Sequence, residues 1–367
     1  MLKFSVMKSD IIDALMTTAK AASSKSVISA LEGILLSLKK NTLTVTGYDL
    51  EIGIKTDVTV KGSGDGELVM NSRLICDMVR KMPDGEISFE ETDNFSLNIS
   101  CGDIKYSVKG IDSKDYPLIP ELSRGESFEI SEPLLKSMIG QTLYAVSTID
   151  TKPVLMGSKF DIKENNINVI SVDGIRIALR KETLLHEDFD FVVPGKTLSE
   201  MLRLLSDDES KIAVISVDRN QCIFKIEKYT VFSRLLEGDF FDYSKIVGYK
   251  SEKEAIVNVR EMMDCVERTM LLINEKFRAS VNLTFDDNIL EINCETPIGK
   301  INQKIAIEYS AEKTEISFNG KYLLDALRNT GCDKVKFYIL STGVQALKIL
   351  PPEGESFMFL VSPMRKR

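Results

Sequence analysis

Residues 70–80 read MNSRLICDMVR, residues 193–203 read VPGKTLSEMLR, and residues 318–328 read FNGKYLLDALR. The three stretches align without a gap, at spacings of 123 and 125 residues. Each has a basic residue at its fourth place, an acidic residue at its eighth and an arginine at its eleventh. Self-similarity at a near-constant spacing is typical of a repeated architecture. The chain of 367 residues is therefore expected to contain three copies of one structural unit.

The sequence on either side of each stretch repeats as well. Strand-like starts at residues 2–6, 128–130 and 255–259 are followed by apolar residues at helical spacing. Other runs alternate apolar and polar residues, which is typical of half-buried strands. Because each copy has only two helices among many strands, the helices must cover one face of an antiparallel sheet. We expect an α+β fold of three repeated domains, at residues 1–121, 122–250 and 251–367. Three unrelated α+β domains are the alternative, which the gapless match disfavours.

The repeat also predicts how the copies join. The ends of each sheet are edges that invite pairing, so successive copies can pair edge to edge into one continuous sheet. The two outermost edges of the chain then stay open. A second chain can cover them by head-to-tail association, which closes a ring if the rotation allows it. Two chains would give a ring of six copies, although three chains or an open arc fit the repeat equally well.

The distribution of charge decides whether such a ring could hold nucleic acid. The net charge of −8 argues against nucleic acid unless the basic residues gather on one surface. In each stretch the two bases are seven residues apart, about two helical turns, so they share one helix face. The pairs are Arg73 and Arg80, Lys196 and Arg203, and Lys321 and Arg328. Repeated three times, they predict a positive band that contacts DNA phosphates without reading the base sequence. The alternative is an ordinary solvated helix face with ion pairs such as Asp77–Arg80.

Several functional classes find no support in the sequence. No run of about 18 apolar residues exists, and the N-terminus lacks an apolar signal core, so we expect a cytoplasmic protein without a membrane partner. Six cysteines without a C-x-x-C pair, and one histidine, predict neither zinc nor disulfides. Phosphate-binding glycine loops and nucleophile elbows are absent. We expect no catalytic residue, no metal and no cofactor. Asp49 and Asp173 fall at corresponding places in two copies, which favours a structural role in a turn.

Five segments resemble a known family. They are residues 46–51 (TGYDLE), 172–177 (VDGIRI), 236–243 (LEGDFFDY), 274–278 (NEKFR) and 361–365 (VSPMR). In order and spacing, over the whole chain, the sequence resembles the bacterial DNA polymerase III beta subunits, which are replicative DNA sliding clamps. The resemblance implies a non-catalytic, head-to-tail homodimer that encircles duplex DNA and confers processivity. It also implies a clamp loader, a nucleoid-associated location, and binding to replicative and repair polymerases and other proteins with a clamp-binding motif.

The resemblance implies three sets of functional residues. For DNA, the positions that match the family include Lys25, Arg73 and Lys196, and Lys152 is the one residue of its loop expected to reach a phosphate. Together with the bases of the repeat, the expected DNA-binding residues are Lys25, Arg73, Arg80, Lys152, Lys196, Arg203, Lys321 and Arg328. The expected partner-peptide pocket, between the second and third copies, comprises Leu155, Val172, Gly174, Arg176, Ile177, Phe241, Ile246, Ala346, Leu360, Val361, Ser362, Pro363 and Met364. The expected dimer interface sets Tyr106 and Val108 against Leu271 and Leu272.

Two readings of these residues stay open. Leu155, Ile177 and Val361 fit a plain hydrophobic core as well as a pocket, and Arg176 fits a cation at the pocket rim. At the level of the molecule, the alternative is a protein-interaction hub that never encircles DNA. Substituting the repeated bases would discriminate, because only a clamp should then lose its hold on DNA.

Overall fold

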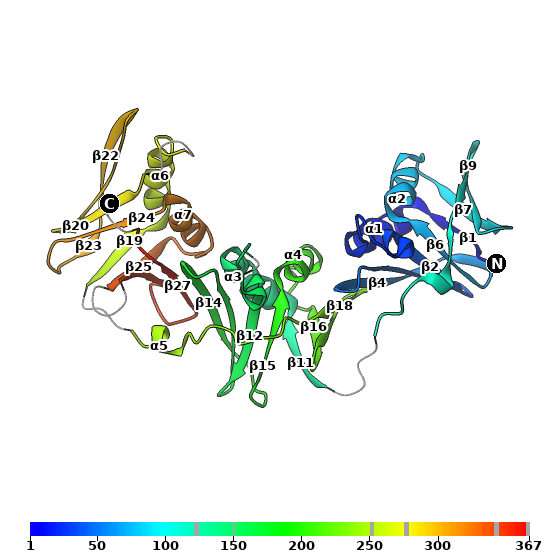
Figure 1. Ribbon diagram of the computed structural model, residues 1–367, viewed down its shortest axis with the longest axis horizontal. Coiled ribbons are helices and arrows are strands. Elements are labelled where there is room, and N and C mark those ends of the chain that lie inside the picture. The colour runs from blue at the N-terminus through cyan, green and yellow to red at the C-terminus, as the bar shows by residue number, and fades with distance from the viewer. Residues whose placement is uncertain (121–124, 150, 250–252, 275–278, 341–344, 365–367) are drawn as a thin grey trace. The chain divides into compact units, whose positions relative to one another are not determined.

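The computed structural model describes residues 1–120, 125–149, 151–249, 253–274, 279–340 and 345–364 (Figure 1). The chain divides into two compact units, Met1–Lys136 with Ser199–Leu235, and Ser137–Leu198 with Leu236–Arg367. The predicted domain boundaries at 121/122 and 250/251 lie outside the described residues.

The first copy begins with a strand and a helix, as the sequence predicts. Its elements are β1 (Lys3–Met7), α1 (Lys8–Thr18), β2 (Gly33–Lys39), β3 (Thr42–Tyr48), β4 (Ile52–Thr59), β5 (Lys61–Gly64), β6 (Gly66–Asn71), α2 (Ser72–Lys81), β7 (Glu86–Thr92), β8 (Ser96–Cys101), β9 (Ile104–Lys109) and β10 (Ile111–Asp112).

The second and third copies repeat this order. The second contains β11 (Glu126–Ser131), α3 (Glu132–Thr142), β12 (Gly157–Lys163), β13 (Asn166–Val172), β14 (Arg176–Thr183), β15 (Phe189–Pro194), α4 (Gly195–Leu204), β16 (Ile212–Asp218), β17 (Gln221–Ile226) and β18 (Tyr229–Arg234), and is followed by the short helix α5 (Ser244–Val247). The third contains β19 (Glu254–Asn258), α6 (Val259–Met270), β20 (Val281–Asp286), β21 (Ile289–Thr296), β22 (Gly299–Ala306), β23 (Glu308–Tyr309), β24 (Thr314–Phe318), α7 (Gly320–Arg328), β25 (Lys334–Leu340), β26 (Ala346–Leu350) and β27 (Phe357–Val361).

Each unit contains one nine-stranded sheet that crosses from one copy to the next. In the first unit the order is β10-β6-β2-β3-β4-β18-β17-β16-β11, and in the second it is β15-β12-β13-β14-β27-β26-β25-β19-β23. The seams are antiparallel: β4 pairs with β18 (Ile54 opposite Val231), and β14 with β27 (Ile177 opposite Leu360). The prediction that successive copies pair edge to edge is confirmed, and so is the α+β class with antiparallel sheets. The expectation of one continuous sheet along the chain is wrong, because the two seams belong to two separate nine-stranded sheets.

A smaller sheet completes each unit. The first unit has the order β5-β1-β7-β8-β9, and the second has β22-β21-β20-β24. β9 and β22 therefore stand at sheet edges, with a hydrogen-bonded neighbour on one side only among the described strands. Figure 1 shows α6 and α7 side by side on the third copy. These helices pack apolar faces onto the sheets, as when α7 buries Leu323, Leu324 and Leu327.

Turns and helix ends repeat as closely as the helices do. The Asp49 carboxylate accepts hydrogen bonds from the backbone N–H groups of Glu51 and Ile52, and that of Asp173 accepts the same two bonds one copy later. Because both aspartates tie down a turn through local backbone bonds, their predicted structural role is confirmed. Asn71 and Asn319 likewise cap α2 and α7 by accepting backbone N–H bonds.

The cysteines behave as buried apolar residues. All six thiols are free, and five of them are buried. Burial raises the pKa of the Cys76 thiol to about 11, which leaves almost no reactive thiolate at neutral pH. Within the described ranges, none of the helices has the length and apolar character that crossing a bilayer requires.

Candidate DNA-binding surface and peptide pocket

The repeated bases lie on the exposed faces of α2, α4 and α7. The Arg73 side chain is 92% exposed, and those of Arg80, Arg203 and Arg328 are more than half exposed. Lys196 and Lys321 are exposed, as are Lys25 and Lys152 in the loops after the first helices. All eight predicted DNA-binding residues are therefore accessible to a phosphate.

Each arginine at the eleventh place also has an acidic partner. Arg80 Nη2 lies 2.6 Å from Asp77 Oδ1, and Arg203 Nη1 lies 2.9 Å from Glu200 Oε2. In the third copy Arg328 instead reaches Glu267 on the neighbouring helix α6, at 2.6 Å. Exposed ion pairs of this kind contribute about 0–1 kcal/mol, so a phosphate can compete for the arginines. The ion pairs foreseen as the alternative thus exist, and they do not block the surface.

In the third copy, the acidic residue at the eighth place is Asp325, and it pairs with a residue of the second copy instead of with Arg328. Asp325 accepts a hydrogen bond from Arg176 Nη1 at 2.6 Å, while Arg176 Nε donates to Asp173 at 2.8 Å. The guanidinium carbon also lies 4.7 Å from the ring centre of Tyr322 and 5.3 Å from that of Tyr144. Although burial lowers it, hydrogen bonds to Asp325 and Asp173 leave the pKa of Arg176 raised overall. With its side chain 11% exposed, Arg176 braces the β14–α7 contact and presents little surface to a ligand.

The seam between β14 and β27 gathers part of the predicted pocket. One apolar cluster contains six of them: Leu155, Val172, Ile177, Ile246, Ala346 and Leu360. Val361 belongs to the core of the third copy instead, which is the plain-core reading for that residue. Phe241 and Met364 are each about 40% exposed, and Ser362 and Pro363 are half-buried. Gly174 occupies the turn held by Asp173 with a positive φ of 89°, a conformation that favours glycine.

The same cluster contains residues that the sequence reasoning missed. They are Ile170, Leu179, Leu340, Met358, Phe240, Tyr243, Tyr249 and Leu350. Leu179 and Ile170 could have been found from the period of two along a strand, because they share a sheet face with Ile177 and Val172. Tyr243 and Tyr249 flank α5, and no pattern in the sequence predicts where that short helix docks.

The predicted interface residues lie at sheet edges and helix ends. Tyr106 and Val108 are on β9, where Tyr106 is 36% exposed. Leu271 follows α6 and is 81% exposed, and Leu272 is half-buried. In the described parts of the chain, no group of three His, Cys, Asp or Glu residues could hold a metal ion.

Known protein families match the three copies one after another along the chain. Models of the N-terminal, central and C-terminal domains of the DNA polymerase III beta subunit match residues 2–120, 129–242 and 245–365. The beta sliding clamp of Staphylococcus aureus is 31% identical, with 100% of both chains covered. That of Halalkalibacterium halodurans is 31% identical over 95% of both chains. The crystal structure of the DNA polymerase sliding clamp from Bacillus subtilis superposes with a TM-score of 0.94 at 28% identity, covering 100% of both chains.

Proposed function

The chain belongs to the DNA polymerase III beta subunit family, the beta sliding clamps, and from that premise we propose that two copies close head to tail into a ring around duplex DNA. The observation that carries the proposal is the pair of continuous sheets. Each seam inside the chain joins neighbouring copies by backbone hydrogen bonds, and β9 and β22 are among the strands at the ends of the sheets. Joining β9 of one chain to β22 of the other would cover both edges. Tyr106, Val108, Leu271 and Leu272 supply apolar surface at that junction.

In this proposal the exposed bases of the repeated helices contact the phosphate backbone. Phosphate contacts carry no sequence information, so the ring slides along any duplex. The eight DNA-binding residues remain those given above, with Arg73 the most accessible arginine among them. The net charge of −8 means that acidic residues predominate elsewhere on the chain. They repel DNA from surfaces other than the basic helices.

We further propose that the apolar cluster at the β14–β27 seam is the pocket for partner peptides. An apolar groove with few fixed polar groups accepts varied sequences, which suits a site shared by replicative and repair polymerases and the clamp loader. Arg176 then supports the pocket wall through Asp173 and Asp325. The chain carries out no chemistry itself in this scheme: it tethers its partners to the DNA, in the cytoplasm and at the nucleoid.

Topology separates the clamp from a hub that never encircles DNA. The chain is loaded with a matched clamp loader and ATP onto a nicked circular plasmid, and the products are separated by gel filtration in high salt. Co-elution with the circle that disappears when the plasmid is linearised supports the ring. Equal retention on both forms, or none with a loader that is active on its own clamp, rejects it.

A charge-reversal pair tests the basic helices. The double variant Arg73→Glu, Lys196→Glu should load poorly and leave the circle faster, while peptide binding stays unchanged. Lys225→Glu is the matched control, because Lys225 is an exposed lysine on strand β17, away from the repeated helices. Equal loss of retention in the control would show that total charge, rather than the repeated surface, holds the DNA.

A further inference from the structure

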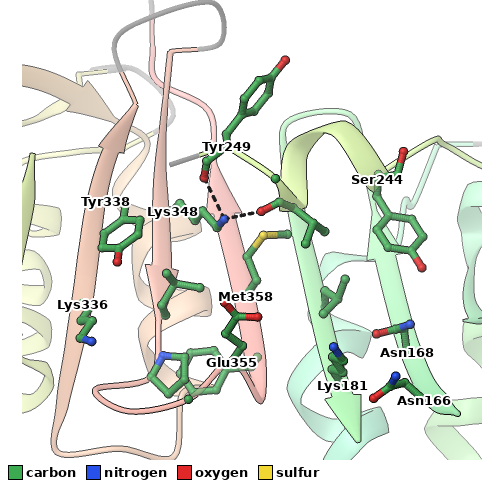
Figure 2. A pocket seen from close by; sticks show the side chains of 18 of the residues that line it. Asn166, Asn168, Lys181, Ser244, Tyr249, Lys336, Tyr338, Lys348, Glu355 and Met358 are labelled. Carbon is green, nitrogen blue, oxygen red and sulfur yellow. Dashed lines mark hydrogen bonds between the residues drawn. The ribbon is translucent and has the colours of Figure 1, made fainter. Parts of the chain in front are cut away.

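A cleft of 770 Å³ opens on the second unit beside α5. Figure 2 shows Asn166, Asn168 and Lys181 on one wall and Lys336 and Tyr338 on the other. This volume is within the range of ligand-binding sites. None of the thirteen residues predicted for the partner pocket lines this cleft, but the cleft adjoins the pocket, because five residues of the apolar cluster line it: Leu179, Tyr243, Tyr249, Leu350 and Met358.

The cleft and the partner pocket share one face of the nine-stranded sheet. Along β14, Ile177 belongs to the apolar cluster only, whereas Leu179, two residues on, belongs to the cluster and also lines the cleft. Along β27, Leu360 belongs to the cluster only, whereas Met358 belongs to the cluster and also lines the cleft. Residues two apart on a strand point to the same side, about 7 Å from each other. The helix α5 lies between the two sites and continues this pattern, because Ile246 packs in the pocket cluster while Val247 lines the cleft.

A buried lysine fixes α5 in this position. Lys348 is 5% exposed, and its ammonium group donates to the carbonyl oxygens of Val247 at 2.8 Å and Tyr249 at 3.1 Å (Figure 2). These carbonyls are at the end of α5, where no helical N–H remains to bond them. Burial lowers the pKa of Lys348. The Lys348 ammonium group is therefore occupied by the chain's own carbonyl oxygens, and the positive charge available to a ligand must come from the other lysines.

The remaining lysines make the cleft suited to an anion. Lys163, Lys181 and Lys336 line it, and within the described residues none of the three has an acidic group within ion-pair distance. The acidic side chains of the lining are Glu164 and Glu355, so the basic groups are in excess. Phe357, Met358 and Leu179 give the cleft an apolar floor. A ligand with carboxylates beside apolar groups matches this lining better than a bare inorganic ion.

We propose that the cleft binds a short acidic peptide segment, carried by the same partner whose apolar residues occupy the partner pocket. The proposal rests on the proposed function of that pocket. It is supported by the continuity of the sheet face and by the excess of lysines. To reach the cleft, the partner chain must cross α5, which is about 10 Å wide. About four extended residues cover that distance, since each spans about 3.3 Å.

Tailed peptides test the proposal on the full chain. The core peptide is fluorescein-labelled Ala-Leu-Met-Leu-Phe. It is extended by a four-residue Gly-Ser linker and a tail, at the N-terminus in one series of peptides and at the C-terminus in the other. In each series the tail is either the acidic Asp-Glu-Asp or the neutral Asn-Gln-Asn. Fluorescence polarisation in 50 mM NaCl should show about fivefold tighter binding for the acidic tail, the size expected for two partly exposed ion pairs. Shortening the linker to one residue should remove the gain, because the tail can no longer cross α5.

Substitutions assign the gain to the cleft. The double variant Lys181→Gln, Lys336→Gln should bind the acidic and neutral tails equally, while Glu355→Gln should increase the preference for the acidic tail. Lys225→Gln is the matched control and should leave the fivefold difference unchanged. An unaltered affinity for the tailless peptide shows that the variants remain folded.

The outcomes separate this inference from the proposed function. If the tailless peptide binds and the acidic tail adds nothing, the inference is overturned and the pocket stands. If the tailless peptide does not bind, the pocket assignment is in error, and the tail with its linker is then titrated alone. Absence of charge-dependent binding in that titration overturns the inference as well.

Discussion

Arg176 is enclosed by two carboxylates and two aromatic rings, so its removal leaves unbalanced charge behind. We expect Arg176→Ala to lower the free energy of unfolding by about 3 kcal/mol, because Asp173 and Asp325 are largely buried and lose their shared cation. Urea denaturation followed by tyrosine fluorescence measures this, since the chain contains no tryptophan. Arg203→Ala is the control: that side chain is 62% exposed, and its loss should cost less than about 0.5 kcal/mol. Equal costs would contradict the bracing role.

Asp13 makes a second interaction that pH can test. Its carboxylate accepts hydrogen bonds from the Tyr229 hydroxyl at 2.5 Å and the Lys228 ammonium at 2.9 Å, and these bonds lower the pKa of Asp13. A lowered pKa gives stability that is present above the unfolded value, about 4, and is lost as pH falls through the folded value. The difference in unfolding free energy between the native chain and Asp13→Asn should therefore shrink from pH 6 to pH 3. A difference that does not vary with pH would refute the assignment.

Single residues also show what a sequence can and cannot predict. The exposure of Arg73 and Lys196 follows from helical period alone. The link between Arg176 and Asp325 joins residues 149 positions apart, and no local pattern encodes such a distance. The resemblance placed Arg176 at the pocket, and the structure adds that its two acidic partners, Asp173 and Asp325, belong to the same chain.

At the scale of elements, α5 is too short to hold itself in place. A helix of four residues does not persist in water, so its position depends on the two bonds from Lys348. Lys348→Met keeps the apolar stem and removes both bonds. We expect faster hydrogen exchange of the backbone amides of residues 243–249, measured by mass spectrometry. Lys336→Met is the comparison, because Lys336 makes no bond to α5, and unchanged exchange in the Lys348 variant would show that packing alone fixes the helix.

The sequence repeat predicts which helices and strands form, but it does not predict which strands pair with one another. Two helices per copy and paired sheet edges follow from periodicity and from the cost of open edges. That β4 meets β18 and β14 meets β27 does not follow, because register depends on which side chains pack across a seam. The cleft beside α5 escaped sequence reasoning for the same reason, as its walls come from strands far apart in the chain.

At the scale of the whole molecule, the two sheet edges of the proposed junction both carry lysines. β9 bears Lys105 and Lys109, and β22 bears Lys300 and Lys304. In the proposed ring these lysines face each other, so association should strengthen as salt screens the repulsion. We expect the dimer dissociation constant, measured by analytical ultracentrifugation, to fall between 50 and 300 mM NaCl.

A charge swap provides the control for that prediction. The variant Lys300→Glu, Lys304→Glu should dimerise more tightly at low salt and weaken as salt is added. If the unaltered chain weakens steadily with salt, the lysines of the two edges do not meet in the assembly.

The continuous sheets carry a consequence for the history of the chain. A protein made of one copy alone would expose both of its edges, and it could satisfy them only by meeting other copies of itself. Three such proteins would have to associate to form the pairing that one chain now holds covalently. Within a single chain, the β4–β18 and β14–β27 contacts are intramolecular and therefore permanent. In the proposed ring, the β9–β22 contact is then the one reversible contact per chain, and it is where the ring can open.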